Sequence, residues 1–239
     1  MKNILIALFS IVTSVAWAQT NPVIIELFTS QGCSSCPAAD KNLTEILQRA
    51  KKDGRPVYGL SFHVDYWNYI GWKDPYSNKE FTARQRQYGE QMNLRSIYTP
   101  QMIVNGSQEF VGSNESESKS AVEVAMKQKP TYTISISNLT AANGKLSFHY
   151  ALDKIPSNEI INIAIVERET ENYVPRGENS GRKLHHDNVV RSFVTNPSKQ
   201  QQDVALNLPE MNLQKASIIV YLQNKDWQVV GAVAKELNL

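Results

Sequence analysis

The order of hydrophobic and polar residues in the first half of the chain predicts alternating strands and helices. Two short apolar runs, Val23 to Phe28 and Val57 to Phe62, have the character of strands that are buried on both faces. Between them, apolar residues recur at helical spacing from Cys36 until Asp53-Gly54 ends the pattern. A strand, a helix and a second strand in this order predict a right-handed crossover and two parallel strands.

The same half continues with two more helices and a hairpin. An aromatic-rich insertion at about 65–95 ends in a helix predicted over about Lys79 to Met92. Asn105-Gly106 then joins two short apolar strands, and this dipeptide is the strongest short-range signal for a hairpin. A last helix is expected from about Glu115 to Gln128, just before Lys129-Pro130.

After Pro130 the pattern changes to period-two alternation, which predicts strands with one buried face. Turn-forming residues separate the runs, as in an antiparallel sandwich. We therefore expect a first domain over 21–129 and a β-rich domain over 131–239. The alternating runs lie at 132–136, 146–150, 161–165, 204–208, 218–222 and 229–233.

Residues 1–18 have the composition of a cleaved export signal. Lys2 supplies the positive charge, Ile4 to Val15 is the apolar stretch, and Ala16-Trp17-Ala18 matches a cleavage site. A spanning helix needs about 20 apolar residues, and neither this stretch nor a later one reaches that length. We expect a periplasmic or secreted protein without a membrane span.

Charge and motifs exclude several classes of function. The formal net charge is +2, and loss of Lys2 with the signal lowers it to +1. Such a balance argues against binding to nucleic acid or anionic lipid. The sequence shows neither a Gly-rich phosphate loop nor a recognisable Ser-His-Asp arrangement, so we expect no organic cofactor. It leaves the oligomeric state open.

Cys33 and Cys36 are the only cysteines of the chain, and they form a C-x-x-C pair between the first predicted strand and helix. In an oxidising compartment each can pair only with the other. At a helix N-terminus, free N–H groups and the helix dipole favour a thiolate. The pair is therefore a catalytic dithiol, a structural disulfide or, with His63, a copper(I) site.

Three segments should meet at one edge of the first sheet. Parallel strands bring Cys33 and His63-Val64-Asp65 to the same edge, and a following antiparallel strand begins there, directly after Thr99-Pro100. This order of strand, C-x-x-C, helix, strand, Thr-Pro, hairpin and helix resembles the thioredoxin fold. The resemblance implies a cis Thr99–Pro100 bond beside the cysteines, with Cys33 as the attacking thiol and Cys36 as the resolving one.

The predicted fold class is an α/β thioredoxin-like domain with a helical insertion, followed by a mostly antiparallel β-sandwich-like domain. Five segments, among them Gly-Trp-Lys-Asp-Pro and Tyr-Thr-Pro-Gln-Met, carry a closer resemblance. They are similar to an uncharacterised family of secreted, thioredoxin-like bacterial proteins, over essentially the whole mature chain. Because that family has no assigned reaction, the resemblance implies a fold and a compartment but no activity. The segments are 26–37, 61–67, 71–75, 98–102 and 176–182.

Three polar residues near the predicted edge are candidates for auxiliary chemistry. Glu26 lies inside an apolar strand, where it either relays protons between Cys36 and solvent or pairs with a basic residue. His63 is a candidate general base or metal ligand that Asp65 would orient, or else a locally hydrogen-bonded loop residue.

Two segments have open interpretations. The aromatic stretch from Phe62 to Tyr76 forms core or interface, or else an apolar wall for a peptide substrate. Arg176 to His186 is a polar loop, a loop that docks the two domains together, an anion site or a metal site. His185 and His186 are adjacent and cannot easily both face one centre.

Together these observations predict an exported thiol–disulfide oxidoreductase that acts on protein or small-molecule thiols and disulfides through a mixed disulfide. The direction of the reaction stays open. The alternatives are a partner-binding protein with a structural C-x-x-C disulfide and a copper-handling protein that uses Cys33, Cys36 and His63.

Overall fold

The computed structural model describes residues 21–237, so the predicted export signal lies outside the described part. The helices of this part are α1 (Cys36–Lys52), α2 (Lys79–Gln91) and α3 (Glu115–Met126), with 3-10 helices η1 (Asn68–Ile70) and η2 (Leu213–Lys215). None of them is long and apolar enough to cross a membrane. The strands are β1 (Val23–Thr29), β2 (Val57–His63), β3 (Gln101–Val104), β4 (Gln108–Val111), β5 (Ile134–Ala142), β6 (Lys145–Leu152), β7 (Ile160–Glu167), β8 (Thr170–Val174), β9 (Arg182–His186), β10 (Val189–Pro197), β11 (Gln201–Asn207), β12 (Ala216–Gln223) and β13 (Val229–Glu236).

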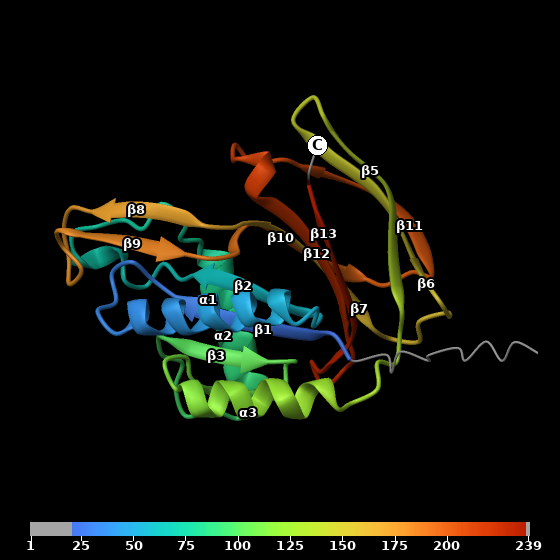
Figure 1. The fold of residues 1–239 in the computed structure, drawn as a ribbon, viewed down its shortest axis with the longest axis horizontal. Helices are drawn as coiled ribbons and strands as arrows, with labels where there is room; N and C mark the ends of the chain where they lie inside the picture. The colour runs from blue at the N-terminus through green and yellow to red at the C-terminus, as the bar shows by residue number, and fades with distance from the viewer. Residues whose placement is uncertain (1–20, 238–239) are drawn as a thin grey trace, which may run out of the picture.

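Eight strands form one mixed sheet in the order β13-β12-β7-β10-β2-β1-β3-β4 (Figure 1). β1 runs parallel to β2 and antiparallel to β3. β2 in turn pairs with β10, where Val189 lies opposite Ser61. Strands from both halves of the sequence therefore share one sheet. β5, β6 and β11 form a separate three-stranded sheet, and β8 and β9 form a hairpin of their own.

Alternation along the strands sends side chains to two differently covered faces. Leu27 of β1 packs with Leu43 of α1 and Ala121 of α3 on one face. Phe28, its neighbour, packs with Tyr88 of α2 on the other. Figure 1 shows α1 and α3 in front of β1 and α2 behind it. Further along the sheet, the three-stranded sheet covers β7 and β12.

The predicted fold class is wrong. The structure is mostly β, with one large mixed sheet and three α-helices in the described residues, rather than a thioredoxin-like α/β domain with a helical insertion and a separate β-sandwich-like domain. The two halves do not form separate sheets because the free edge of β2 pairs with β10, a strand from the second half. β12 is buried along its whole length and lies inside this sheet, and α2 forms one of its covering layers.

Local predictions in the first half are confirmed, since β1, α1, β2, α2, the β3–β4 hairpin and α3 all form within a few residues of the expected bounds. The Thr99–Pro100 peptide bond is cis. In the second half, the expected loop at Arg176 to His186 is instead the turn and second strand of the β8–β9 hairpin, and neither β8 nor β10 was predicted. The polar sequence of β9 gives no clear alternation, because its exposed and buried positions are both occupied by polar residues.

Candidate functional site

Cys33 and Cys36 form a disulfide at the start of α1. Cys36 is the first residue of the helix, and Pro37 suits the first turn because proline needs no N–H partner there. The hydroxyl of Ser35 lies 3.3 Å from Cys33 Sγ. Cys33 is 1% exposed and Cys36 is 0% exposed. The disulfide therefore lies at the positive end of a helix dipole, shielded from solvent.

The turn of the β8–β9 hairpin shields it. Asn179 Nδ2 donates hydrogen bonds to the carbonyl oxygens of Gln31, at 3.0 Å, and Cys33, at 2.9 Å. The backbone N–H of Ser34 donates to Glu178 Oε2 at 2.9 Å. Of the interpretations given to this segment, the structure supports docking of two parts of the chain, although a hairpin turn rather than an irregular loop makes the contacts.

Trp67 connects the cysteine loop with the Thr99–Pro100 segment. Its indole N–H donates to Thr99 Oγ1 at 2.8 Å, and its Cβ lies 3.0 Å from where a Cβ on Gly32 would stand. Pro100 directly precedes β3, whose first residue, Gln101, pairs with Phe28 near the end of β1. Thr99 and Pro100 therefore lie at the edge of the sheet from which the cysteine loop emerges.

His63, at the end of β2, is fully buried and has Asp74 as its partner, with Nδ1 and Oδ2 2.7 Å apart. Asp74 Oδ2 also accepts a hydrogen bond from the backbone N–H of Gln31 at 2.8 Å. Burial by itself would raise the pKa of Asp74, but His63 and backbone N–H groups lower it below its usual value of 3.8. Asp65, the residue expected to orient His63, instead accepts from the Thr82 hydroxyl at 2.6 Å.

The sequence contained one signal for Asp74. It belongs to the Gly-Trp-Lys-Asp-Pro segment, which carries part of the family resemblance and has no structural role that its composition explains. Asp65 follows the strand directly, but its side chain binds α2, on the opposite face of the sheet from α1. Closeness in sequence therefore suggested Asp65 as the partner of His63, whereas the partner is Asp74.

His186 of β9 packs against His63, with ring centroids 4.7 Å apart, and its Nδ1 lies 3.3 Å from Asp40 Oδ2 of α1. The Trp72 indole donates to Gln31 Oε1 at 3.2 Å, so the Gln31 amide nitrogen faces His186 Nε2 at 3.3 Å. An indole N–H can only donate, so the Gln31 side-chain oxygen accepts from Trp72 and its NH2 group donates to His186 Nε2. In the neutral imidazole the proton of His186 therefore lies on Nδ1, toward Asp40.

The surroundings of His186 shift its pKa. Burial by itself would lower the pKa of the imidazole, but the charges of Asp40, Asp74 and Asp187 together raise it above 6.5. His185, the preceding residue, is exposed, so only one of the two histidines faces this centre, as expected.

We call Gln31, Asp40, His63, Asp74 and His186 the buried polar cluster. Within the described residues, every buried side-chain oxygen or nitrogen that lacks a hydrogen-bond partner belongs to this cluster or to a threonine next to it. Such atoms are rare in folded proteins and call for a functional explanation. They are Thr29 Oγ1, both carboxylate oxygens of Asp40, Thr44 Oγ1, His63 Nε2 and His186 Nδ1.

Glu26 lies on the other face of the sheet and is engaged in an ion pair. Arg84 of α2 contacts its two carboxylate oxygens, at 2.6 Å and 2.7 Å. Tyr88 and Tyr221 donate hydroxyl hydrogen bonds to Glu26 Oε1, at 2.6 Å and 3.1 Å. This is the paired carboxylate that was the alternative to a proton relay. Since α1 covers the opposite face, the structure does not bring Glu26 and Cys36 together.

The aromatic stretch forms mainly core and interface. Tyr66 and Trp67 pack against the core beneath α2, and the Tyr76 hydroxyl donates to Asn172 Oδ1 of β8 at 3.1 Å. Tyr69 of η1 differs from them, since 82% of it is exposed. Gly177 of the hairpin turn packs against the neighbouring Ile70, so Tyr69 lies on the element that borders the cover of the disulfide.

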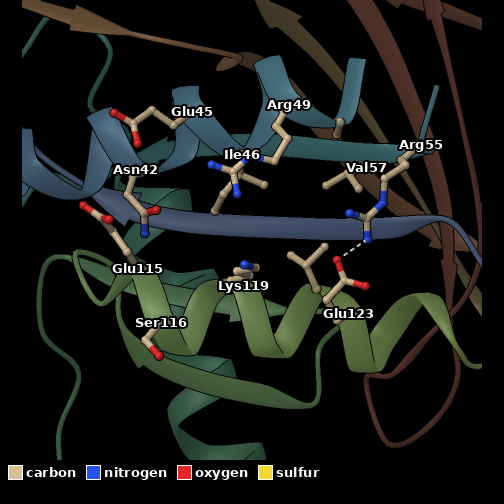
Figure 2. A pocket seen from close by; sticks show the side chains of 12 residues that line it. Asn42, Glu45, Ile46, Arg49, Arg55, Val57, Glu115, Ser116, Lys119 and Glu123 are labelled. Carbon is tan, nitrogen blue, oxygen red and sulfur yellow. Dashed lines mark hydrogen bonds and ion pairs between the residues drawn. The ribbon is translucent and has the colours of Figure 1, made fainter. Parts of the chain in front are cut away.

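A groove of about 600 Å³ lies elsewhere, between α1 and α3. Figure 2 shows Arg49 and Lys119 entering it from opposite sides, and Arg55 and Glu123 paired at one end, 2.6 Å apart. Its walls contain no cysteine and no member of the buried polar cluster. Residues 21–237 also contain no group of three or more His, Cys, Asp or Glu side chains arranged to hold a metal ion, Cys33, Cys36 and His63 included.

Comparison with known proteins gives a family without an assigned reaction. The sequence matches the model of a family described as protein of unknown function, DUF1223, over residues 24–223. The structure is similar to the crystal structure of a protein from Agrobacterium tumefaciens, with a TM-score of 0.68 and 28% identity over 92% of this chain and 97% of that one. A β-glucosidase from Kluyveromyces marxianus aligns with 46% of this chain and 15% of its own, at 11% identity and a TM-score of 0.21, which carries no argument. No curated protein matches the sequence.

Proposed function

We propose that this chain, which belongs to the DUF1223 family of proteins of unknown function, is a thiol–disulfide oxidoreductase whose redox group is the Cys33–Cys36 pair. One observation carries the proposal: the disulfide lies at the N-terminus of α1, directly beside a buried cluster of imidazole and carboxylate groups with unused hydrogen-bonding capacity. The helix dipole favours the thiolate that disulfide exchange requires. A purely structural clip needs no such cluster.

The reaction proceeds by two exchanges. A substrate thiolate attacks Cys33 Sγ, the Cys33–Cys36 bond breaks, and Cys36 leaves as a thiolate. A second substrate thiolate then attacks the substrate sulfur of the mixed disulfide and releases the Cys33 thiolate. The substrate gains one disulfide and the protein becomes a dithiol. The reverse sequence, in which Cys33 attacks and Cys36 resolves, reduces a substrate disulfide, and the reduction potential sets the direction.

Access to Cys33 requires the hairpin turn to move, because the contacts of Glu178 and Asn179 cover the loop. Two exposed aromatic side chains come from elements next to this turn. Tyr69 precedes Ile70, which lies close to Gly32 and Gly177, and Tyr173 lies near the end of β8, just before the turn. Apolar side chains next to a redox pair favour a peptide segment as substrate, since a small polar thiol would gain nothing from them. We therefore propose protein thiols or disulfides as the substrates.

The proposed location is the periplasm or the exterior of the cell. It rests on the export-type sequence of residues 1–18 and on the disulfide, which persists in oxidising compartments.

One observation favours a second function. Both sulfurs are buried, as expected for a structural clip in a partner-binding protein. In that case the disulfide would resist reduction in the folded protein, and breaking it would cost about 2 kcal/mol of stability for a loop this short.

Trapping of mixed disulfides separates the two functions. The Cys36→Ser variant, isolated from the exported fraction of cells, should retain protein partners on Cys33 through bonds that dithiothreitol releases. Cys33→Ser is the matched control and should retain few, because in the proposed reaction the substrate sulfur is bound to Cys33 and Cys36 only resolves that bond. Absence of mixed disulfides from Cys36→Ser, together with a wild-type disulfide that dithiothreitol reduces only in denaturant, would establish the clip.

A further inference from the structure

We propose that Asp40 accepts and returns the proton of Cys36, and that His186 positions Asp40 for this transfer; the inference rests on the proposed function. No sequence pattern singles out Asp40, which lies in the middle of the predicted helix. The assignment comes from the tertiary surroundings of its carboxylate.

Cys36 and Asp40 lie on one side of α1. They are four residues apart, so their Cβ atoms are about 5–6 Å from each other, one helical turn along the same face. Cys36 is fully buried and Asp40 nearly so. A carboxylate can span that separation toward a sulfur directly or through one water, the usual reach of a general base.

Asp40 has acceptor capacity that other nearby carboxylates lack. Neither of its oxygens accepts a hydrogen bond, although both are buried. Asp74, the other carboxylate of the buried polar cluster, accepts from His63, from Gln31 and from the backbone N–H of Tyr76. Glu26 is held by Arg84 on the opposite face of the sheet. Within the buried polar cluster, Asp40 alone combines nearness to Cys36 with free lone pairs.

Each element packed against Asp40 contributes specific groups. β9 contributes His186, whose Nδ1 lies 3.3 Å from Asp40 Oδ2 without the alignment of a hydrogen bond. β2 contributes His63, which lies behind His186 and carries Asp74. Asp187 follows His186 in sequence and adds negative charge. His186 is thus the nearest cation-forming group and sets the position of the carboxylate.

The step is balanced in protons and electrons. When Cys33 carries a substrate sulfur, the Cys36 thiol gives its proton to Asp40, and the Cys36 thiolate attacks Cys33 Sγ. The Cys33–Cys36 bond forms, the bond to the substrate breaks, and the substrate leaves as a thiolate. In the opposite direction Asp40 returns the proton to the Cys36 thiolate that the first exchange releases.

The test is a single turnover of the reduced, mature protein with oxidised glutathione, followed as release of the second glutathione molecule across pH 5 to 10. Asp40→Asn should slow the resolving step by about a hundredfold at neutral pH, the usual worth of a general base. The two rates should converge at high pH, where the thiolate forms without a base. Asp65→Asn, a partly buried carboxylate on the α2 side, should leave the profile unchanged.

His186→Gln separates positioning from proton transfer. It keeps Asp40 and should lower the rate at neutral pH by a smaller factor than Asp40→Asn does, with a profile of the same shape. If Asp40→Asn does not fold, infrared difference spectra of the wild type remain available. Reduction by dithiothreitol should change the band of one buried carboxyl group.

The outcomes are distinct for the two proposals. An identical pH profile in wild type and Asp40→Asn, or no carboxyl change on reduction, overturns the role of Asp40 alone. A wild type that forms no mixed disulfide with glutathione, together with a Cys36→Ser variant that traps no protein partner, removes the proposed function. The infrared test still decides whether Asp40 is coupled to Cys36. Stoichiometric zinc binding by the reduced wild type, lost in Asp40→Asn, would also overturn the proposal, because a ligand role would then explain the unpaired oxygens.

Discussion

The side-chain amide of Asn179 donates a hydrogen bond to the carbonyl oxygen of Cys33, 2.9 Å away across 146 residues of sequence. Asn179 is fully buried, and Arg182 fixes its amide by donating to Oδ1 at 2.7 Å. The hairpin turn is therefore fastened to the backbone of the dithiol loop itself. Any reagent or substrate that reaches Cys33 has to break this contact or wait for it to open.

Asn179→Ala should make the disulfide easier to reach. The change removes the contact with Arg182 inside the hairpin and the two hydrogen bonds to the cysteine loop. Each of the latter two is worth about 1 kcal/mol, so the open population and the rate of reduction by dithiothreitol should rise about 5- to 30-fold. Asn172→Ala is the matched control, because Asn172 lies on the same hairpin but contacts Tyr76. Equal reduction rates in wild type and Asn179→Ala would show that the turn does not limit access.

Arg84→Met should destabilise the whole protein. Arg84 is nearly fully buried and is the partner of Glu26, and removal of one member of a buried ion pair costs about 3–5 kcal/mol because the other charge stays unpaired. Adding Glu26→Gln should recover part of the loss. Urea denaturation measures the free energy of unfolding of the single and the double variant. A loss below about 1 kcal/mol for Arg84→Met would contradict a buried ion pair between Arg84 and Glu26. The rate of disulfide reduction in the folded state should not change, since the pair lies on the α2 face.

Gly106→Ala should destabilise the protein through steric overlap, and Gly144→Ala is the control that lacks this overlap. Gly106 has φ +66, and a Cβ there would lie 1.9 Å from the carbonyl oxygen of Trp227. Gly144 has φ +70 but open space around it. Gly144→Ala should therefore lose only the backbone term of about 1 kcal/mol, and Gly106→Ala about 3 kcal/mol, as strain and overlap add. Similar losses in thermal or urea unfolding would refute close packing of the β3–β4 turn against the β12–β13 loop.

His186 should make stability depend on pH. Its folded pKa is raised above 6.5, so its contribution to the free energy of unfolding is fully present below pH 6.5 and is lost as the pH rises through the folded value. His186→Gln should remove this decline from urea unfolding curves between pH 5.5 and 9. His185→Gln, at the exposed neighbour, should keep it. A free energy of unfolding of the wild type that rises with pH over this range would contradict a raised pKa of His186 in the folded protein.

Much of the candidate site was visible in the sequence because its signals are local. The apolar run before Cys33, the proline after Cys36 and the Asn105-Gly106 turn each act within a few residues, through burial, helix initiation and backbone conformation. The sequence therefore indicated the position of the disulfide on a strand–helix junction and the hairpin after Thr99–Pro100.

The partners of the polar residues were not visible in the same way. Glu26 appeared as a free acid inside a strand, but α2 brings Arg84 onto it from 58 residues away. Asp65 is next but one to His63 in sequence, yet Asp74 is the carboxylate that reaches the ring. A side chain's partner depends on which face of the sheet it occupies and on which helix covers that face.

Residue spacing and composition were enough to predict the local elements of the first half, the pairing of the two cysteines and the charge balance. Three contacts became visible only in the folded chain: β10 pairs with β2, the β8–β9 turn covers Cys33, and Asp40 and His186 meet beside Cys36. Each of these three contacts joins residues that lie more than 100 positions apart in the chain, so it forms only when a long loop closes. No short window of sequence contains both partners of such a contact.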